Sequence, residues 1–206
     1  MNATIKALVK RKATRKIDRG KKFRIKNLIS PIVIGLKWEF CDEVIDLDAT
    51  IVMIDDVGNI VDAVYYNKLV SDCGSIVHSG DNEDGTGVAG FDEFITVHLN
   101  KVSFYVSYLA VLVCSFKGHG FRKVATSAVT LLQDVNKLIK VPLGKMMVDD
   151  SSVLVCFIYR QNQAWLIQNI TQFGQGKNFA ECEELIKKNL KNVGFDETVL
   201  RESKDW

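Results

Sequence analysis

Segments with the pattern of β-strands follow one another closely along most of this chain, and this succession constrains the fold more than any other feature. The segments are short, rich in β-branched and aromatic residues, and separated by turns rather than by long helices. Such a pattern is typical of antiparallel sheets, whose strands need only short connections. The predicted strands are Pro31–Trp38, Asp46–Ile54, Ile60–Asn67, Phe94–Leu99, Val102–Phe116 (one long strand or two broken ones), Val124–Leu132, Val153–Tyr159 and Ala164–Ile170.

One segment near the end of the chain departs from the strand pattern. Between Ala180 and Val193, apolar residues recur at helical spacing with Asn189 off the stripe, and Glu183 and Glu184 each precede a lysine by four positions. Gly194 follows, where a helix commonly ends. We therefore expect a mainly β protein, an antiparallel β-sandwich with a few short helices and a C-terminal amphipathic helix.

Length and composition favour a single soluble domain. No linker or repeat divides the 206 residues, so we expect a basic, partly disordered arm over residues 1–19 and one sandwich domain over residues 20–206. The apolar stretch Val102–Phe116 has 15 residues without a charge, which is short of the roughly 18 that cross a bilayer. The five cysteines show no metal-binding spacing and are odd in number, which favours free thiols and a cytoplasmic location.

The net charge of +2 conceals two oppositely charged regions. Residues 1–26 carry 11 lysines or arginines and one acid, whereas residues 39–93 carry 14 acids and one base. Because the acidic region also contains strong strand patterns, folding must bring carboxylates together. Two unit charges in contact repel by about 1 kcal/mol even in water. A bound cation or the basic arm is therefore expected to offset this repulsion.

The acidic residues form two clusters that suit a hard cation. Residues two apart on a strand share a face, so Asp46 and Asp48 point the same way. The second cluster is the predicted loop Ser79–Glu93, in which four glycines allow sharp turns. Calcium takes six to eight oxygens from carboxylates, amides and main-chain carbonyls, and Asn67 offers a further amide. The alternative is a solvated acidic loop whose Asp and Asn side chains form turns.

Five blocks in the first half of the chain stand in a characteristic order and spacing. They are Ile34-Gly35-Leu36-Lys37-Trp38, Asp46-Leu47-Asp48-Ala49, Tyr65-Tyr66-Asn67, Gly74-Ser75-Ile76-Val77-His78-Ser79-Gly80-Asp81-Asn82 and Asp92-Glu93. Together these blocks resemble the TerD family of tellurite-resistance and general stress proteins. Weaker blocks, around Gly120–Ser127, Phe157–Trp165 and Phe173–Gly176, extend the resemblance over residues 17–194. Two features depart from the family: Val113-Cys114-Ser115 replaces a segment that usually holds an acid, and the basic N-terminal extension is not a family feature.

The resemblance implies a β-sandwich that binds one or two Ca²⁺ ions through these acidic loops. It also implies a binding or scaffold role in a stress response, with other proteins of a stress complex as partners, some of them membrane-associated, and no obligate small-molecule cofactor. No histidine stands in a recognisable catalytic motif, so we do not expect an enzyme. The implied metal ligands are Asp46, Asp48, Asn67, Asp81, Asn82, Gly85, Asp92 and Glu93.

The basic arm supports an alternative interpretation. A calcium-responsive adaptor would bind an anionic membrane or nucleic acid through this segment, since clustered Lys and Arg are attracted to both. The residues expected to make these contacts are Lys10, Arg11, Lys12, Arg15 and Lys16.

Overall fold

The strands predicted from the sequence are present in the computed structural model, which describes residues 18–40, 44–83, 85, 90–134, 136–143 and 149–195. Nearly all of the predicted basic arm, including its five contact residues, lies outside the described residues. The strands are β1 (Lys22–Arg24), β2 (Ile32–Phe40), β3 (Leu47–Asp55), β4 (Ile60–Val64), β5 (Ile76–His78), β6 (Glu93–Val97), β7 (Val106–Ser115), β8 (Val124–Gln133), β9 (Asn136–Pro142), β10 (Ser152–Gln161) and β11 (Ala164–Gly174).

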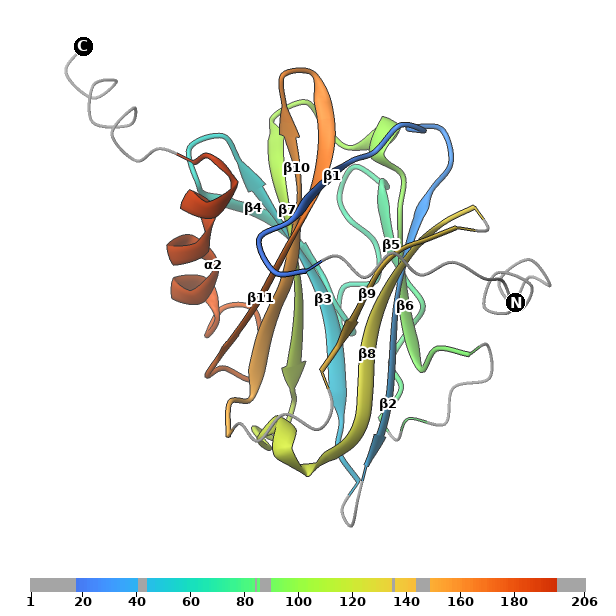
Figure 1. Ribbon diagram of the computed structural model, residues 1–206, viewed down its shortest axis with the longest axis vertical. Helices are drawn as coiled ribbons and strands as arrows, with labels where there is room; N and C mark the ends of the chain where they lie inside the picture. The colour runs from blue at the N-terminus through green and yellow to red at the C-terminus, as the bar shows by residue number, and fades with distance from the viewer. Residues whose placement is uncertain are drawn as a thin grey trace.

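The strands form two antiparallel sheets that face each other (Figure 1). One sheet has the order β1-β11-β10-β7-β3-β4, and the other has the order β5-β6-β2-β8-β9. Strand β3 pairs with β7 along its whole length, from Leu47 opposite Ser115 to Asp55 opposite Val106. The mainly β, antiparallel sandwich expected from the sequence is confirmed.

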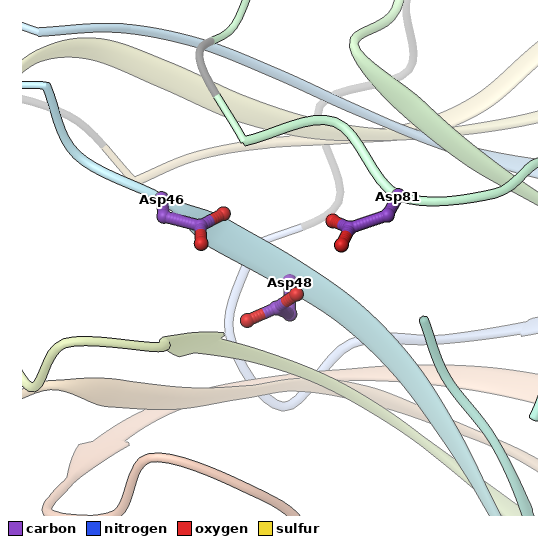
Figure 2. Close-up of side chains that lie close together, drawn as sticks. All are labelled: Asp46, Asp48 and Asp81. Atoms are coloured by element: carbon purple, nitrogen blue, oxygen red, sulfur yellow. The ribbon is translucent and has the colours of Figure 1, made fainter. Parts of the chain in front are cut away.

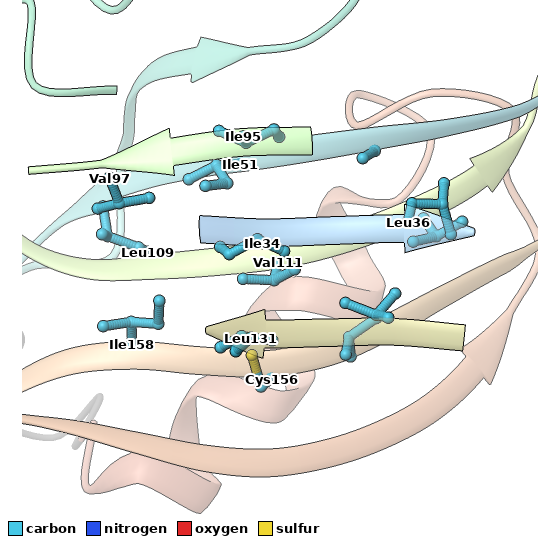
Figure 3. Packing of buried hydrophobic residues seen from close by; sticks show 14 of the residues in the cluster. Ile34, Leu36, Ile51, Ile95, Val97, Leu109, Val111, Leu131, Cys156 and Ile158 are labelled. Carbon is cyan, nitrogen blue, oxygen red and sulfur yellow. The ribbon is translucent and has the colours of Figure 1, made fainter. Parts of the chain in front are cut away.

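Alternate side chains of the central strands build two apolar layers. Figure 3 shows the layer between the sheets, where Ile51, Leu109, Val111 and Ile158 meet Ile34 and residues of its neighbouring strands. The opposite face of the six-stranded sheet carries a second buried cluster, which includes Val52, Leu112 and Phe157. Strand β3 is therefore buried on both faces, as its almost wholly apolar centre predicts.

The second cluster is covered by the helix α2 (Glu183–Leu190), which continues as a short 3₁₀ helix, Lys191–Val193. Cys182, Ile186 and Leu190 are buried on this face, and Gly194 ends the helix at a φ of 90°. Asn189, which lies off the apolar stripe, is also buried, and its amide donates a hydrogen bond to the Leu185 carbonyl.

Three details of the strands differ from the sequence prediction. Val102–Phe116 contains one strand, β7, as one of the two predicted alternatives had it, but this strand begins only at Val106, after a short 3₁₀ helix (Leu99–Lys101). Strand β4 ends at Val64, because Tyr65 and Lys68 form a turn closed by an isolated bridge. The short strands β1, β5 and β9 were not predicted. A further 3₁₀ helix spans Phe121–Lys123. Within the described part of the chain, no helix is long and apolar enough to span a membrane.

Candidate metal centre

Three aspartates converge at the end of the sandwich where β3 begins. Figure 2 shows Asp46 and Asp48 at the start of β3 and Asp81 on the segment that follows β5, with their carboxylates directed into a common space. One oxygen from each lies within 4.8 Å of an oxygen of the other two. Asp46 and Asp48 point the same way, as their spacing predicts. Asp81 is far from them in the sequence and is brought beside them by the fold.

The local geometry of β3 explains why this place is open to side chains. Strand β4 pairs with β3 only from Ile51 onward, so no strand of the described residues lies beside the edge of β3 near Ala49 on that side. Side chains satisfy its backbone groups instead: the Ala49 N–H donates to Glu93 Oε2 at 2.8 Å, and His78 Nε2 lies 3.2 Å from the Ala49 carbonyl oxygen. Both side chains are buried, Glu93 completely.

The same two side chains hold the loop that carries Asp81. His78 Nδ1 accepts a hydrogen bond from the Gly80 N–H at 3.1 Å, so Nε2 carries the hydrogen that faces Ala49. Glu93 Oε1 accepts the N–H of Asn82 at 3.3 Å, and Asn82 Oδ1 accepts the N–H of Gly85 at 2.7 Å. Glu93, Asn82 and Gly85 thus form a layer of hydrogen bonds behind the three aspartates.

The electrostatics of the centre are unfavourable for the protein alone. Burial, and then the carboxylates of Asp81 and Glu93, raises the pKa of Asp46 to about 6. Burial, and then Glu93 and Asp46, raises the pKa of Asp48 to about 8. Two buried oxygens, Asp46 Oδ1 and Asp48 Oδ2, have no hydrogen-bond partner. Buried polar atoms nearly always have a hydrogen-bond partner, so these two oxygens indicate a binding site for a group from outside the protein.

The aspartates line an open pocket with a volume of about 540 Å³. Sequence reasoning missed several of its lining residues. Glu83 could have been found, because it lies in the same acidic loop as Asp81. Tyr66 and Phe116 lie edge to face, with ring centroids 5.7 Å apart, and Lys117 lowers the pKa of Asp46 against the larger effects that raise it. The pocket is lined by Val44, Asp46, Asp48, Tyr66, Asp81, Asn82, Glu83, Phe116 and Lys117.

Besides Glu93 and Gly85, two more of the implied ligands, Asp92 and Asn67, do not line the pocket. The Asp92 carboxylate accepts the Trp38 N–H at 2.8 Å through Oδ2, and its Oδ1 lies 3.0 Å from Lys37 Nζ. It therefore fastens the end of the acidic loop to β2. Asn67 is exposed in the turn after β4 and does not line the pocket, although its neighbour Tyr66 does.

The arrangement fits a divalent cation with a preference for oxygen. Ligand oxygens bound to one calcium at roughly 2.3–2.6 Å can lie no more than about 5 Å from each other, and the oxygens of Asp46, Asp48 and Asp81 satisfy this limit. The negative charge of these carboxylates would be balanced by the positive charge of the cation. The two unpaired buried oxygens would also gain a partner, which no described protein group supplies.

Comparisons with known proteins give a consistent result. The TerD domain model matches residues 14–184 of the chain. The tellurium resistance protein TerZ of Serratia marcescens is 42% identical over 93 residues. This match covers 45% of this chain and 48%, about half, of the length of TerZ. General stress protein 16U of Bacillus subtilis is 27% identical over 72% of this chain and 83% of that protein. The crystal structure of a TerD homologue from Streptomyces coelicolor shares the fold, with a TM-score of 0.68 and 20% identity over 77% of this chain and 98% of the homologue.

Proposed function

This chain belongs to the TerD domain family, and from that premise we propose that it is a calcium-binding module of a tellurite or general stress response. It acts by binding, as a scaffold for other proteins of that response, rather than by catalysis. The names of the similar proteins, a tellurium resistance protein and a general stress protein, support the biological setting.

The unpaired oxygens of Asp46 and Asp48 are the observation that carries the calcium proposal. A buried carboxylate that faces other carboxylates and lacks a donor is costly. A solvated acidic loop would expose these groups to water, but Asp46 and Asp48 are only 8% and 4% exposed. A divalent cation removes the cost, because it binds the unpaired oxygens and offsets the repulsion.

Calcium suits this centre better than magnesium. The three carboxylate donors come from the start of a strand, for Asp46 and Asp48, and from a glycine-containing loop, for Asp81, rather than from one rigid element. Calcium accepts many oxygens in variable geometry, whereas magnesium requires a near-ideal octahedron of short bonds and gives up its water reluctantly. We therefore expect calcium to bind more tightly than magnesium.

Calorimetric titration of the whole chain with Ca²⁺ and with Mg²⁺ tests the proposal. Asp48→Asn is the best variant, because the amide has the shape of the protonated carboxyl that a pKa of about 8 favours at neutral pH. The variant is expected to stay folded and to lose at least tenfold in calcium affinity. Asp56→Asn removes the same charge from an exposed position in the turn after β3 and should bind calcium like the wild type.

Two outcomes would contradict the proposal. One is the absence of saturable calcium binding by the folded wild-type protein. The other is an equal, small loss of affinity in Asp48→Asn and Asp56→Asn, since that would show only a general effect of negative charge.

A further inference from the structure

The opposite end of the sandwich contains a second pocket, which is lined by apolar side chains around one arginine. Its volume is about 390 Å³, within the range of about 300–1,000 Å³ that is usual for small-molecule sites. We call it the Arg160 pocket, and every residue that lines it is described. The lining residues are Leu28, Leu99, Asn100, Val102, Phe104, Arg160, Gln163, Ala164 and Trp165.

The register of the central strands separates this pocket from the acidic centre. Tyr159, the residue before Arg160, pairs with Tyr108 of β7, and Tyr108 pairs with Ile54 near the end of β3. Asp48 lies at the start of the same strand. Six residues of extended chain, from Asp48 to Ile54, span about 20 Å. In Figure 1 the β10–β11 hairpin and the beginning of β3 accordingly lie at opposite ends. This distance is about two Debye lengths at physiological salt, so the aspartates repel an anion only weakly there.

The Arg160 guanidinium has an unbalanced charge. Its Nη2 donates to the carbonyl oxygens of Val102 and Ser103, at 2.9 and 3.1 Å. Its central carbon lies 4.6 Å from the centre of the Trp165 ring. No Asp or Glu of the described residues makes an ion pair with it, and Nε is buried without a hydrogen-bond partner. Carbonyl oxygens and an aromatic face stabilise a cation but do not neutralise it.

The surroundings indicate what kind of anion would pair with this group. Trp165, Leu99 and Val102 are buried and form an apolar wall, while Phe104 at the mouth is 87% exposed. Exposed Lys26 and Lys101 belong to the two segments that contribute Leu28 and Asn100 to the pocket. An inorganic ion would leave the apolar wall wet, and a neutral apolar molecule would leave the guanidinium unpaired.

We propose that the Arg160 pocket binds a small organic anion. Its carboxylate pairs with the guanidinium of Arg160, and its apolar chain or ring packs against Trp165 and Phe104. Because the carbonyls of Val102 and Ser103 already accept the hydrogens of Nη2, the carboxylate accepts a charge-assisted hydrogen bond from Nη1. No described residue accepts a hydrogen bond from Nη1 of Arg160, which leaves that nitrogen for the ligand.

The experiment compares 4-phenylbutyrate with its neutral counterpart, 4-phenylbutanol, by calorimetry and by the NMR signals of the tryptophan indoles, using the whole chain. We expect 4-phenylbutyrate to bind saturably at one site and at least tenfold more tightly than the alcohol. Arg160→Gln should lose at least tenfold in affinity for the anion but little for the alcohol. Arg122→Gln, which removes an exposed arginine near the acidic end, should leave binding unchanged.

Two further variants separate ligand binding from a purely structural role of Arg160 as a clamp on Val102 and Ser103. Ala164→Leu partly fills the pocket and leaves Arg160 itself unchanged, and it should weaken binding of 4-phenylbutyrate at least tenfold. Arg160→Lys keeps the charge and should retain part of the affinity if Arg160→Gln does not fold. Equal affinity for acid and alcohol, unchanged binding in folded Arg160→Gln, or no effect of Ala164→Leu would each overturn the proposal.

Discussion

Asp48 illustrates how a single residue couples proton and metal binding. Its side chain is almost fully buried, one of its oxygens has no partner, and burial is the main reason that its pKa rises to about 8. At neutral pH without a cation, the proton therefore takes the place that the ion would occupy. Calcium coordinates only the ionised carboxylate, so ion and proton compete for the same oxygens.

We predict that calcium binding at pH 7 releases about one proton per ion, because Asp48 is mostly protonated and Asp46 mostly ionised before binding. Titrations in buffers with different ionisation enthalpies measure this number as the slope of the apparent binding enthalpy. At pH 9 the slope should fall close to zero. A slope near zero at pH 7 would show that both aspartates are already ionised and that burial does not raise the pKa of Asp48 above neutral pH.

The sequence allowed only part of this centre to be predicted. Asp46 and Asp48 follow from the two-residue period of a strand, and the glycine-containing acidic loop indicates a third donor. That Asp92 binds the Trp38 N–H instead could not be predicted, since this contact depends on how β2 lies beside the loop. Lys117 and Tyr66 are likewise brought in by tertiary structure, as neither has a local pattern that indicates a site.

Among the secondary-structure elements, β2 determines the path of the chain into β6 through a contact at one glycine. The ring of Phe91 lies so close to Gly35 that a Cβ atom at position 35 would be 2.4 Å from two of its ring atoms. Phe91 packs with Val33 and Leu132 in a small buried cluster, and the next residue, Asp92, donates its N–H to the Leu36 carbonyl. This contact orients the segment that ends at Glu93.

We predict that Gly35→Ala lowers the free energy of unfolding by about 1–3 kcal/mol through overpacking and weakens calcium binding, because the displaced ring shifts Glu93. Phe91→Ala should cost about 3 kcal/mol or more. The double variant should cost less than the sum, since the new methyl group occupies space that the ring has left. Denaturant unfolding and calcium titration measure both effects.

Gly20→Ala serves as the control, because its Cβ meets nothing within 4 Å and only the φ of 79° is unfavourable. It should leave calcium affinity unchanged. Strict additivity of Gly35→Ala and Phe91→Ala would show that the Phe91 ring moves away freely and that β2 does not orient the loop.

At the scale of the whole molecule, the sandwich was predictable because apolar alternation and short turns recur along the chain. Strands β1, β5 and β9 were not predicted. Strands β1 (Lys22–Arg24) and β5 (Ile76–His78) have only three residues each, and β9 contains two lysines among seven residues, so none of them gives a strong strand pattern. The sandwich keeps the acidic centre and the Arg160 pocket at opposite ends of the same strands. This separation leads us to expect that the two sites bind their ligands independently.

The same carboxylates make the stability of the whole fold depend on pH. Because the pKa values of Asp46 and Asp48 are raised to about 6 and about 8 in the folded state from 3.8, the native protein holds more protons than the unfolded chain between these values. Stability without a cation must then fall as pH rises from about 4 to about 8. Each retained proton contributes on the order of 1.4 kcal/mol per pH unit.

We predict that, in the presence of a chelator, the wild type loses more stability between pH 5 and pH 7 than Asp48→Asn, which cannot ionise at this position. The extra loss in the free energy of unfolding of the wild type should be roughly 2–3 kcal/mol. Calcium at a hundredfold excess over its dissociation constant adds about 2.7 kcal/mol to the wild type at pH 7, and less at pH 5, where protons compete. Thermal and denaturant unfolding at both pH values measure these terms. If the wild type and Asp48→Asn show the same pH dependence, Asp48 is not held protonated in the fold, and the cost that a cation is proposed to relieve does not exist.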